Sequence, residues 1–383
     1  MNTLEKSLRG TLEKTIIEAR SASEETAKII LEQLGVGEKV PFIHLSEEER
    51  KLRNKLRSHG HQLGDKQFGD KSQSIDNLVE EVAYQHWHRM LFARFLAENN
   101  LLMDDDPDSP IPMSLDECND LASSMGASNG WELAARFASN MLPQIFQQDS
   151  PIFQLQFPIE RQKVLEQLVA GIPLEVFKAS DSLGWVYQFW QTKRKEDINK
   201  SGVKIGAREL PAVTQLFTEP YMVSFLLDNS LGAWWASRRL SNHDLSSAKD
   251  EQELRDKVRL SGMSLEYLRF VKEDGVWFPA SGTFDAWPED LSVFKMLDPS
   301  CGSGHFLVAT FEMLVPMRMK VEELSVDEAI EKVLKENIYG LELDQRCVEL
   351  AAFALAFAAW TYPGSSGYQN LPSLHIACSG QAS

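Results

Sequence analysis

Hydrophobic residues recur every three or four positions through the first half of the chain, which is the spacing of amphipathic helices. The longest such run covers residues 3–34 and stops at Gly35 and Gly37, so it predicts one long helix or a pair of helices. No strand pattern competes before residue 190, and residues 1–205 are predicted to form a helical domain. Further helices are predicted at residues 75–99, 131–141 and 158–170, and from Ser46, which forms a capping box with Glu49.

The pattern changes in the second half, where short apolar runs alternate with helical ones. This alternation is typical of a parallel sheet with crossover helices, so residues 206–383 are predicted to form an α/β domain. Residues 241–256 are polar and predict a surface insertion, while residues 275–288 predict a loop; together they suggest an insertion at about 241–290. Strands are predicted at residues 293–297, 338–344 and 374–377, and helices at residues 306–320, 325–337 and 345–360.

A glycine-rich turn, Asp-Pro-Ser-Cys-Gly-Ser-Gly-His-Phe at residues 298–306, lies between the first of these strands and a helix. Gly302 and Gly304 lack a Cβ and tolerate positive φ, so a ligand could approach the backbone closely. The free N–H groups at the helix start favour an anionic or carboxylate group. An ordinary glycine turn between a strand and a helix is the plainest alternative.

Two phosphate-binding motifs do not fit this turn. A P-loop needs Lys-Ser or Lys-Thr after its last glycine, and His305-Phe306 stands there. A dinucleotide-binding loop needs a small residue for helix–strand packing where this sequence has Leu307. An acidic strand end followed by Pro-x-Cys-Gly-x-Gly instead resembles the S-adenosylmethionine motif of adenine-N6 DNA methyltransferases of the gamma-type motif order.

A second segment strengthens the resemblance. Residues 214–223 contain Thr-x-Pro-x-x-Val, which resembles the methyltransferase segment that closes over the methionine end of the cofactor. As plain packing, Thr218 would cap a helix whose first turn holds Glu219 and Pro220. Both interpretations stay open on the sequence alone.

The resemblance implies S-adenosylmethionine as the cofactor. Glu342, at the end of the second predicted strand, would hydrogen-bond the ribose hydroxyls, as acidic residues do in doubly wound folds. Asp344 is alternatively a helix cap, and the two roles can coexist. The implied cofactor contacts are Thr218, Tyr221, Asp298, Pro299, Ser300, Cys301, Gly302, Gly304, Phe306, Glu342 and Leu343.

The form of the loop, the N-terminal helices and Trp287-Pro288 together look most like PglX-type methyltransferases of BREX phage-defence systems. The resemblance implies a partial doubly wound, Rossmann-like domain. It also implies a site-specific enzyme that methylates adenine N6 in DNA, in phage defence or restriction-modification. Such enzymes carry Asn-Pro-Pro-Tyr or a close variant after the fourth strand, and neither Asn-Pro-Pro nor Asp-Pro-Pro occurs in this sequence.

The missing motif implies that this chain is the N-terminal portion of a larger enzyme, or one half of a split one, inactive alone and without an assignable catalytic residue. The second half of the sheet and a target-recognition domain are expected elsewhere. A non-catalytic S-adenosylmethionine-binding or scaffold module of a defence complex is the alternative. It is favoured by the acidic charge and by the missing motif.

Charge bears on the DNA partner. The net charge is −17, which opposes phosphate contact, so DNA should bind mainly through regions outside this chain. Two basic stretches leave local contact open: residues 50–57 as a phosphate-facing helix or a solvated face, and residues 193–208 as a single-strand site or a flexible loop. Aromatic residues at 185–190 precede the second stretch. Other defence proteins are possible partners.

Several classes of protein are disfavoured. No apolar run reaches the length of a membrane span, and the charged first nine residues lack a signal-peptide core, so a cytoplasmic protein is expected. The four cysteines show no metal-ligand spacing and predict free thiols. His86 and His88 are two positions apart and should face different sides of a helix, so no metal site is expected.

Overall fold

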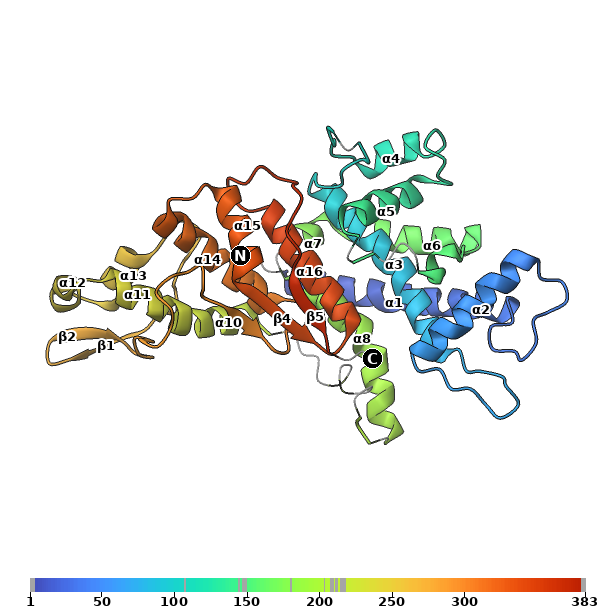
Figure 1. Ribbon diagram of the computed structural model, residues 1–383, viewed down its shortest axis with the longest axis horizontal. Helices are drawn as coiled ribbons and strands as arrows, with labels where there is room; N and C mark the ends of the chain where they lie inside the picture. The colour runs from blue at the N-terminus through green and yellow to red at the C-terminus, as the bar shows by residue number, and fades with distance from the viewer. Residues whose placement is uncertain are drawn as a thin grey trace. The chain divides into compact units, whose positions relative to one another are not determined.

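The computed structural model describes residues 4–106, 108–143, 145–146, 150–179, 181–202, 204–206, 210, 213 and 218–379. The chain divides into two compact units, Met1–Lys193 and Arg194–Ser383 (Figure 1). Among the described residues, none of the helices is long and apolar enough to cross a membrane.

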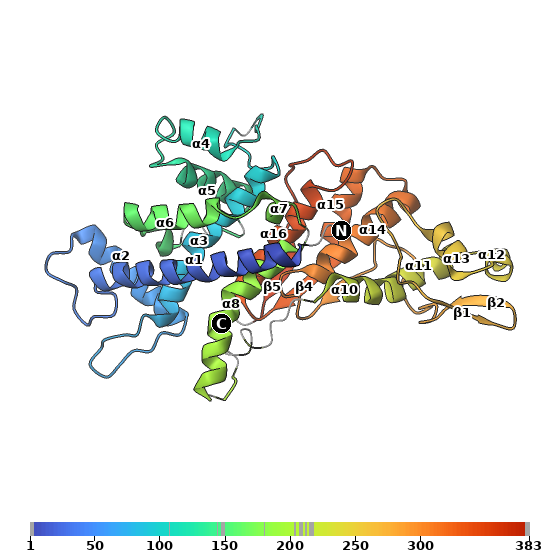
Figure 2. The same cartoon turned by 180° about the vertical axis from the view of Figure 1, so that it is seen from behind.

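The first unit is helical, as the periodicity predicts. Helix α3 is its centre: it contacts α1, α5 and α6, and it is buried on almost all sides (Figure 2). In its described residues the strand-like pairings are two isolated bridges, Gln67 with Gln73 and Met103 with Pro112. The helices are α1 (Lys6–Gln33), α2 (Glu47–Gln62), α3 (Asp76–Glu98), α4 (Leu115–Leu121), α5 (Gly130–Met141), α6 (Ile159–Ala170), α7 (Leu174–Lys178) and α8 (Ser182–Ser201), with a 3-10 turn η1 at Pro151–Gln154.

Histidines and aromatic rings form the interior of this unit. His86 stacks on Phe157 with ring centres 4.2 Å apart, and His88 lies 3.9 Å from the ring of Phe92. The two histidines therefore have separate partners in the core. The prediction that they face different sides of the helix agrees with this placement.

The basic stretch on α2 serves the fold. The capping box of Ser46 and Glu49 is confirmed at its start. Arg53 is buried and donates to the carbonyls of Gly35 and Glu38, while Arg57 donates to the carbonyls of Val36 and Glu38 at 2.5 and 2.6 Å. These guanidinium groups hydrogen-bond the carbonyls that follow α1. Arg53 and Arg57 are therefore neither directed at a phosphate nor simply solvated.

The predicted flexible loop after residue 193 is wrong for residues 193–201, because α8 continues through them to Ser201. The stretch is rich in helix-forming Lys, Arg and Glu, and Lys200 pairs with Glu196 one turn earlier at 3.1 Å. The preceding aromatics Tyr187, Phe189 and Trp190 are buried, so they offer no exposed stacking surface for bases. Arg208 lies outside the described residues.

The second unit contains a three-stranded parallel sheet in the order β3-β4-β5, with α14, α15 and α16 packed against it. In register, Met296 pairs with Ile338 and Gly340 with Ile376. The strands are β3 (Met296–Asp298), β4 (Ile338–Glu342) and β5 (His375–Cys378), and the three helices are α14 (His305–Glu322), α15 (Val326–Glu336) and α16 (Gln345–Trp360). Helix α14 continues past Pro316, which lies inside it.

The two faces of this sheet differ. Ile338 and Gly340 of β4 point toward the helices and are buried, whereas Leu341 is 36% exposed and Leu297 of β3 is 55% exposed. The apolar pattern of residues 338–344 predicts a buried strand. That prediction is wrong for alternate positions, because Tyr339 and Leu341 are less buried than Ile338 and Gly340.

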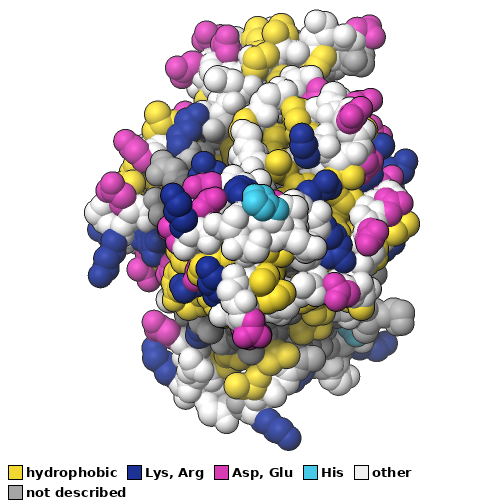
Figure 3. All heavy atoms as spheres, turned by 90° about the vertical axis from the view of Figure 1, so that its left-hand side faces the viewer, with side chains coloured by type: hydrophobic (Ala, Val, Ile, Leu, Met, Phe, Trp, Pro, Cys, Tyr) yellow, Lys and Arg dark blue, Asp and Glu magenta, His cyan; other side chains and the backbone are white. Residues whose placement is uncertain are grey.

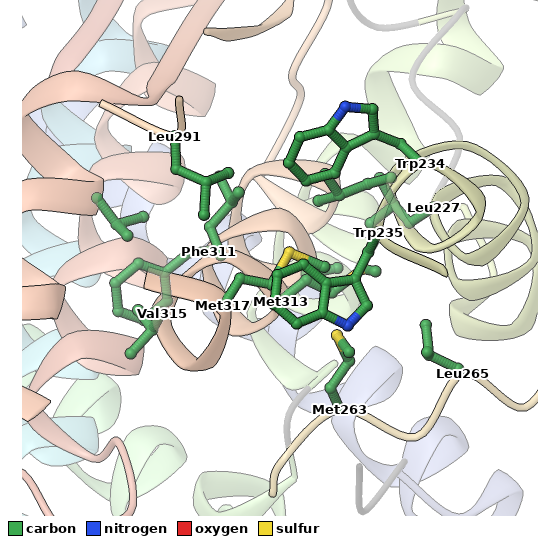
Figure 4. Close-up of a cluster of buried hydrophobic side chains, with 14 of the residues drawn as sticks. Leu227, Trp234, Trp235, Met263, Leu265, Leu291, Phe311, Met313, Val315 and Met317 are labelled. Carbon is green, nitrogen blue, oxygen red and sulfur yellow. The ribbon is translucent and has the colours of Figure 1, made fainter. Parts of the chain in front are cut away.

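One core joins the remaining elements to α14 (Figure 4). Trp234 and Trp235 belong to the same buried cluster as Phe311, Met313 and other side chains of that helix. These elements are α10 (Pro220–Leu227), a π-helical segment η2 (Asp228–Gly232), α11 (Ala233–Arg239), α12 (Asn242–Ser247), α13 (Glu251–Val258), β1 (Phe270–Glu273) and β2 (Val276–Pro279).

Two predictions for this region need correction. Residues 241–256 form α12 and the start of α13, and Ala248 and Leu254 are buried in the shared core, so they are more than a surface insertion. The predicted loop at 275–288 includes β2, which forms an antiparallel hairpin with β1. Asp274-Gly275 is a favoured two-residue hairpin turn, and this signal was available in the sequence.

The outer part of this unit carries charges of both signs. Figure 3 views the molecule from the end that carries α12 and the β1–β2 hairpin, and basic and acidic side chains are interspersed there. Lys257 pairs with Asp244 at 2.7 Å and Arg269 with Glu251 at 3.1 Å. This face therefore presents no continuous basic surface for a nucleic acid.

Candidate functional site

The glycine turn connects β3 to α14 as the sequence predicts. Asp298 ends the strand, Gly302 and Gly304 have φ of +53° and +88°, and Gly304 is the residue before the first turn of α14. Both glycines therefore lie in the left-handed region that other residues rarely adopt. The backbone N–H of Cys301 donates to the carbonyl of Leu341 at 3.0 Å and ties the turn to β4.

Close packing beneath the turn explains the position of Gly304. A Cβ at Gly304 would lie 3.0 Å from both the Cα and the Cβ of Ala351 on α16. A Cβ at Gly302 would meet nothing within 4 Å. The turn is thus pressed against α16 at Gly304 and open at Gly302.

Gly340 on β4 is a site residue that the sequence analysis missed. A Cβ there would lie 3.0 Å from Leu307 and 3.2 Å from the sulfur of Cys301. Glycine inside a strand often marks a close approach of this kind, and that signal was present in Ile338-Tyr339-Gly340. In dinucleotide-binding loops a small residue on the helix lets the helix and the strand approach closely. Leu307 stands at that position here, and Gly340 on the strand provides the space instead.

Glu342 lies at the carboxyl end of β4 and faces the turn. One carboxylate oxygen, Oε2, accepts a hydrogen bond from the N–H of Gly302 at 2.8 Å. The other, Oε1, accepts from the N–H groups of Leu343 at 2.6 Å and Asp344 at 3.3 Å. The structure therefore joins two segments that lie 40 residues apart in the sequence.

Asp298 brings a second carboxylate to this place. Burial raises the pKa of Asp298, the hydrogen bond from the Ser300 N–H opposes the rise, and the charge of Glu342 adds to it. The Ser300 N–H donates to Asp298 Oδ1 at 3.0 Å. Two acidic groups at the carboxyl ends of neighbouring parallel strands suit a cationic or hydroxyl-bearing ligand better than an anion.

The remaining predicted residues lie around this centre. Pro299, Ser300 and Leu343 are exposed, whereas Phe306 is partly buried against the core. Asp344 caps α16, since its side chain accepts from the Arg346 N–H at 3.0 Å. The predicted role of Asp344 as a helix cap is therefore confirmed, and it can coexist with a separate role of Glu342.

Thr218 and Tyr221 lie at the start of α10. Glu219 is the N-cap position of α10 and makes no side-chain capping bond, and Pro220 is the first helical residue, so the prediction that Thr218 caps this helix is wrong. Proline has no backbone N–H, so Pro220 at the first helical position needs no acceptor. This explains why α10 begins without a side-chain cap. Helix α10 contacts α14, and Tyr221 is 53% exposed. Residues 214–217 lie outside the described part.

All four cysteines are free, as predicted, and the described residues contain no cluster of histidine, cysteine and acidic side chains that could hold a metal ion. Burial raises the pKa of Cys301 to about 12, and the charges of Asp298 and Glu342 add to this effect. Cys301 is thus a packing residue whose backbone belongs to the turn.

Thiol reactivity should follow burial. We expect iodoacetamide to label Cys378 first in the native chain, because Cys378 is partly exposed while the other three thiols are buried. Cys118, whose pKa burial raises to about 11, should react slowly together with Cys301, since only the thiolate attacks. Peptide mass spectrometry at successive times measures the order. Labelling of Cys301 as fast as Cys378 would contradict the buried placement.

Comparison with known proteins adds a family context. Residues 281–368 match the sequence model of the DNA-methyltransferase domain of MmeI. The chain is 26% identical over 321 residues to the adenine-specific methyltransferase PglX of Lacticaseibacillus casei (strain Zhang), a match covering 74% of this chain and 26% of that protein. It is 30% identical over 196 residues to the adenine-specific methyltransferase BrxX of Escherichia coli O9:H4 (strain HS), covering 51% of this chain and 15% of that protein.

The resemblance to adenine-specific methyltransferases of the PglX and BrxX kind is therefore confirmed. A shorter match, 31% identical over 117 residues, is to the adenine-specific methyltransferase PglX of Streptomyces coelicolor and covers 30% of this chain and 9% of that protein. The matches span about a quarter or less of these relatives.

Proposed function

We propose that this chain, which resembles PglX-type adenine-specific methyltransferases, forms the cofactor-binding portion of a site-specific DNA methyltransferase. The full enzyme would transfer a methyl group from S-adenosylmethionine to adenine N6 in phage defence or restriction-modification. One observation carries the proposal: the left-handed glycine turn after β3 meets Glu342 at the carboxyl end of β4. Ligands of open α/β sheets bind at this edge of the sheet.

The fold supports the same assignment. The parallel order β3-β4-β5 with connecting helices is consistent with part of a doubly wound, Rossmann-like domain beginning near residue 206. Strand β3 lies at one end of this order, and a neighbour on its free side is expected from the rest of the enzyme. An edge strand left unpaired would be a liability.

The residues present fit S-adenosylmethionine. The side of Gly302 on which a Cβ would lie is open, and Asp298 and Glu342 supply acceptors for ribose hydroxyls and a negative field for a cationic centre. Glu342 would hold the ribose, and the backbone of residues 298–304, with Phe306 and Leu343, would line the site. Thr218 and Tyr221 would close it from α10. When bound, the cofactor would supply an electrophilic methyl group on sulfur.

DNA is the proposed substrate, held mainly by regions outside this chain. The net charge of −17 opposes phosphate contact, and Arg53 and Arg57 are engaged by backbone carbonyls. The Asn-Pro-Pro or Asp-Pro-Pro motif that holds the amino group of an extruded adenine in such enzymes does not occur in the sequence. The same two observations favour the second candidate, a non-catalytic S-adenosylmethionine-binding or scaffold module working with other defence proteins.

Cofactor binding tests the proposal. Glu342→Ala should weaken S-adenosylmethionine binding by roughly 1.5–3 kcal/mol, because a charge-assisted hydrogen bond to the ribose is lost. Isothermal titration calorimetry on the 383-residue chain measures the change. Glu331→Ala on the exposed surface of α15 removes the same charge and should leave the affinity unchanged.

Two results would overturn parts of the proposal. If the unmodified chain bound no S-adenosylmethionine, the cofactor assignment would be wrong. If the chain alone transferred tritium from labelled S-adenosylmethionine to DNA, the proposed dependence on other regions would be wrong, and so would the module alternative.

A further inference from the structure

Four N–H groups of the glycine turn have partners within the chain. Ser300 donates to Asp298 Oδ1 at 3.0 Å and Gly302 to Glu342 Oε2 at 2.8 Å. Cys301 donates to the Leu341 carbonyl at 3.0 Å, and Gly304 to the Cys301 carbonyl at 2.8 Å. Two of the four acceptors are therefore carboxylates of this chain.

A phosphate site needs the opposite arrangement. Phosphates bind glycine turns at helix starts because free N–H groups and the helix dipole offer a positive field. Here a carboxylate takes the N–H of Gly302, where the turn is most open. No lysine or arginine occurs between Asp298 and Glu312 to offset that charge.

Glu342 is held in this position from both sides. Its Oε1 accepts from the N–H groups of Leu343 and Asp344, while its Oε2 accepts from Gly302. The carboxylate is thus fixed between the end of β4 and the turn. A ligand phosphate would have to break the bond to Gly302 and lie close to both Glu342 and Asp298.

We propose that Glu342 is a specificity-determining residue that excludes phosphate-bearing nucleotides by occupying the N–H of Gly302. The site then accepts adenosine derivatives that carry no phosphate on the 5′ side, with an uncharged or cationic group near the turn. This inference rests on the proposed function, because it concerns the selectivity of the same cofactor site. It assigns Glu342 a role beyond holding the ribose.

A ratio of affinities separates the two roles. S-adenosylhomocysteine and ADP share adenine and ribose, so loss of the ribose contact weakens both ligands alike. The ratio of the Kd for ADP to the Kd for S-adenosylhomocysteine therefore reports on the 5′ end alone. Calorimetry should give a high ratio for the unmodified chain and a ratio lower by about tenfold or more for Glu342→Ala.

The Glu342→Gln variant tests how the exclusion works. Its amide oxygen can still accept from Gly302 but carries no charge, so the ratio should fall between those of the other two proteins. Glu331→Ala is the matched control and should keep the ratio of the unmodified chain. Circular dichroism checks the fold of each variant, and if Glu342→Ala does not fold, Glu342→Gln alone decides.

A second measurement needs no nucleoside. Phosphorus NMR with inorganic pyrophosphate should show no binding to the unmodified chain and measurable binding to Glu342→Ala, whose Gly302 N–H is free. If neither adenosine ligand bound the unmodified chain, the proposed function would fail, and pyrophosphate would still decide this inference. Unchanged affinity ratios, or equal pyrophosphate binding in all proteins, would overturn it.

Discussion

Replacing Phe311 by Ala is expected to lower the free energy of unfolding of the second unit by about 3–5 kcal/mol. The ring of Phe311 is fully buried in α14, with Leu291, Trp235 and Met317 in the same cluster (Figure 4). It also meets the ring of Tyr362 edge to face at 6.0 Å. Truncation would leave a cavity between α14 and the elements packed on it, which cannot close without moving several large side chains.

Urea unfolding combined with amide hydrogen exchange measures this effect and locates it. The midpoint of the second unit should fall, and peptides from α14 and α15 should exchange faster while those from α3 stay unchanged. Leu297→Ala is the control, because Leu297 is 55% exposed and should cost less than about 0.5 kcal/mol. An unchanged exchange rate in α14 would show that Phe311 is not part of a tightly packed core.

The elements that the sequence predicted best are those with strong local signals. Helix α16 runs from Gln345 to Trp360, the range that its almost wholly apolar pattern predicted. The capping box at Ser46 and the strand, turn and helix around Gly304 were also predicted in place. Each depends on residues within one or two turns of one another, so a single stretch of sequence contains the whole signal.

The features that the sequence did not predict depend on distant partners. The bond between Gly302 and Glu342 spans 40 residues, and the close approach at Gly340 needs Leu307 from another element. The exposed face of β4 could not be read from its apolar residues, because exposure depends on what covers the sheet. The hairpin of β1 and β2 is different, because its Asp274-Gly275 turn is a local signal within a stretch whose composition is otherwise typical of a loop.

Gly304→Ala is expected to have the other large effect, on stability and on cofactor binding together. Gly304 has φ of +88°, and a non-glycine residue in such a conformation costs about 1–3 kcal/mol. The added methyl would also lie 3.0 Å from Ala351, an overpacking cost of about 1–3 kcal/mol. The turn should shift away from α16, displacing Gly302 from Glu342.

Gly302→Ala is the matched comparison, because Gly302 also has positive φ, at +53°, but its methyl would meet nothing within 4 Å. Its loss of stability should be smaller, and the difference between the two variants measures the contact with Ala351. Thermal unfolding compares stability, and calorimetry with S-adenosylmethionine compares the site. If Gly304→Ala proved no more damaging than Gly302→Ala, the turn would have room to move over α16. The close packing at Ala351 would then not be what holds Gly302 against Glu342.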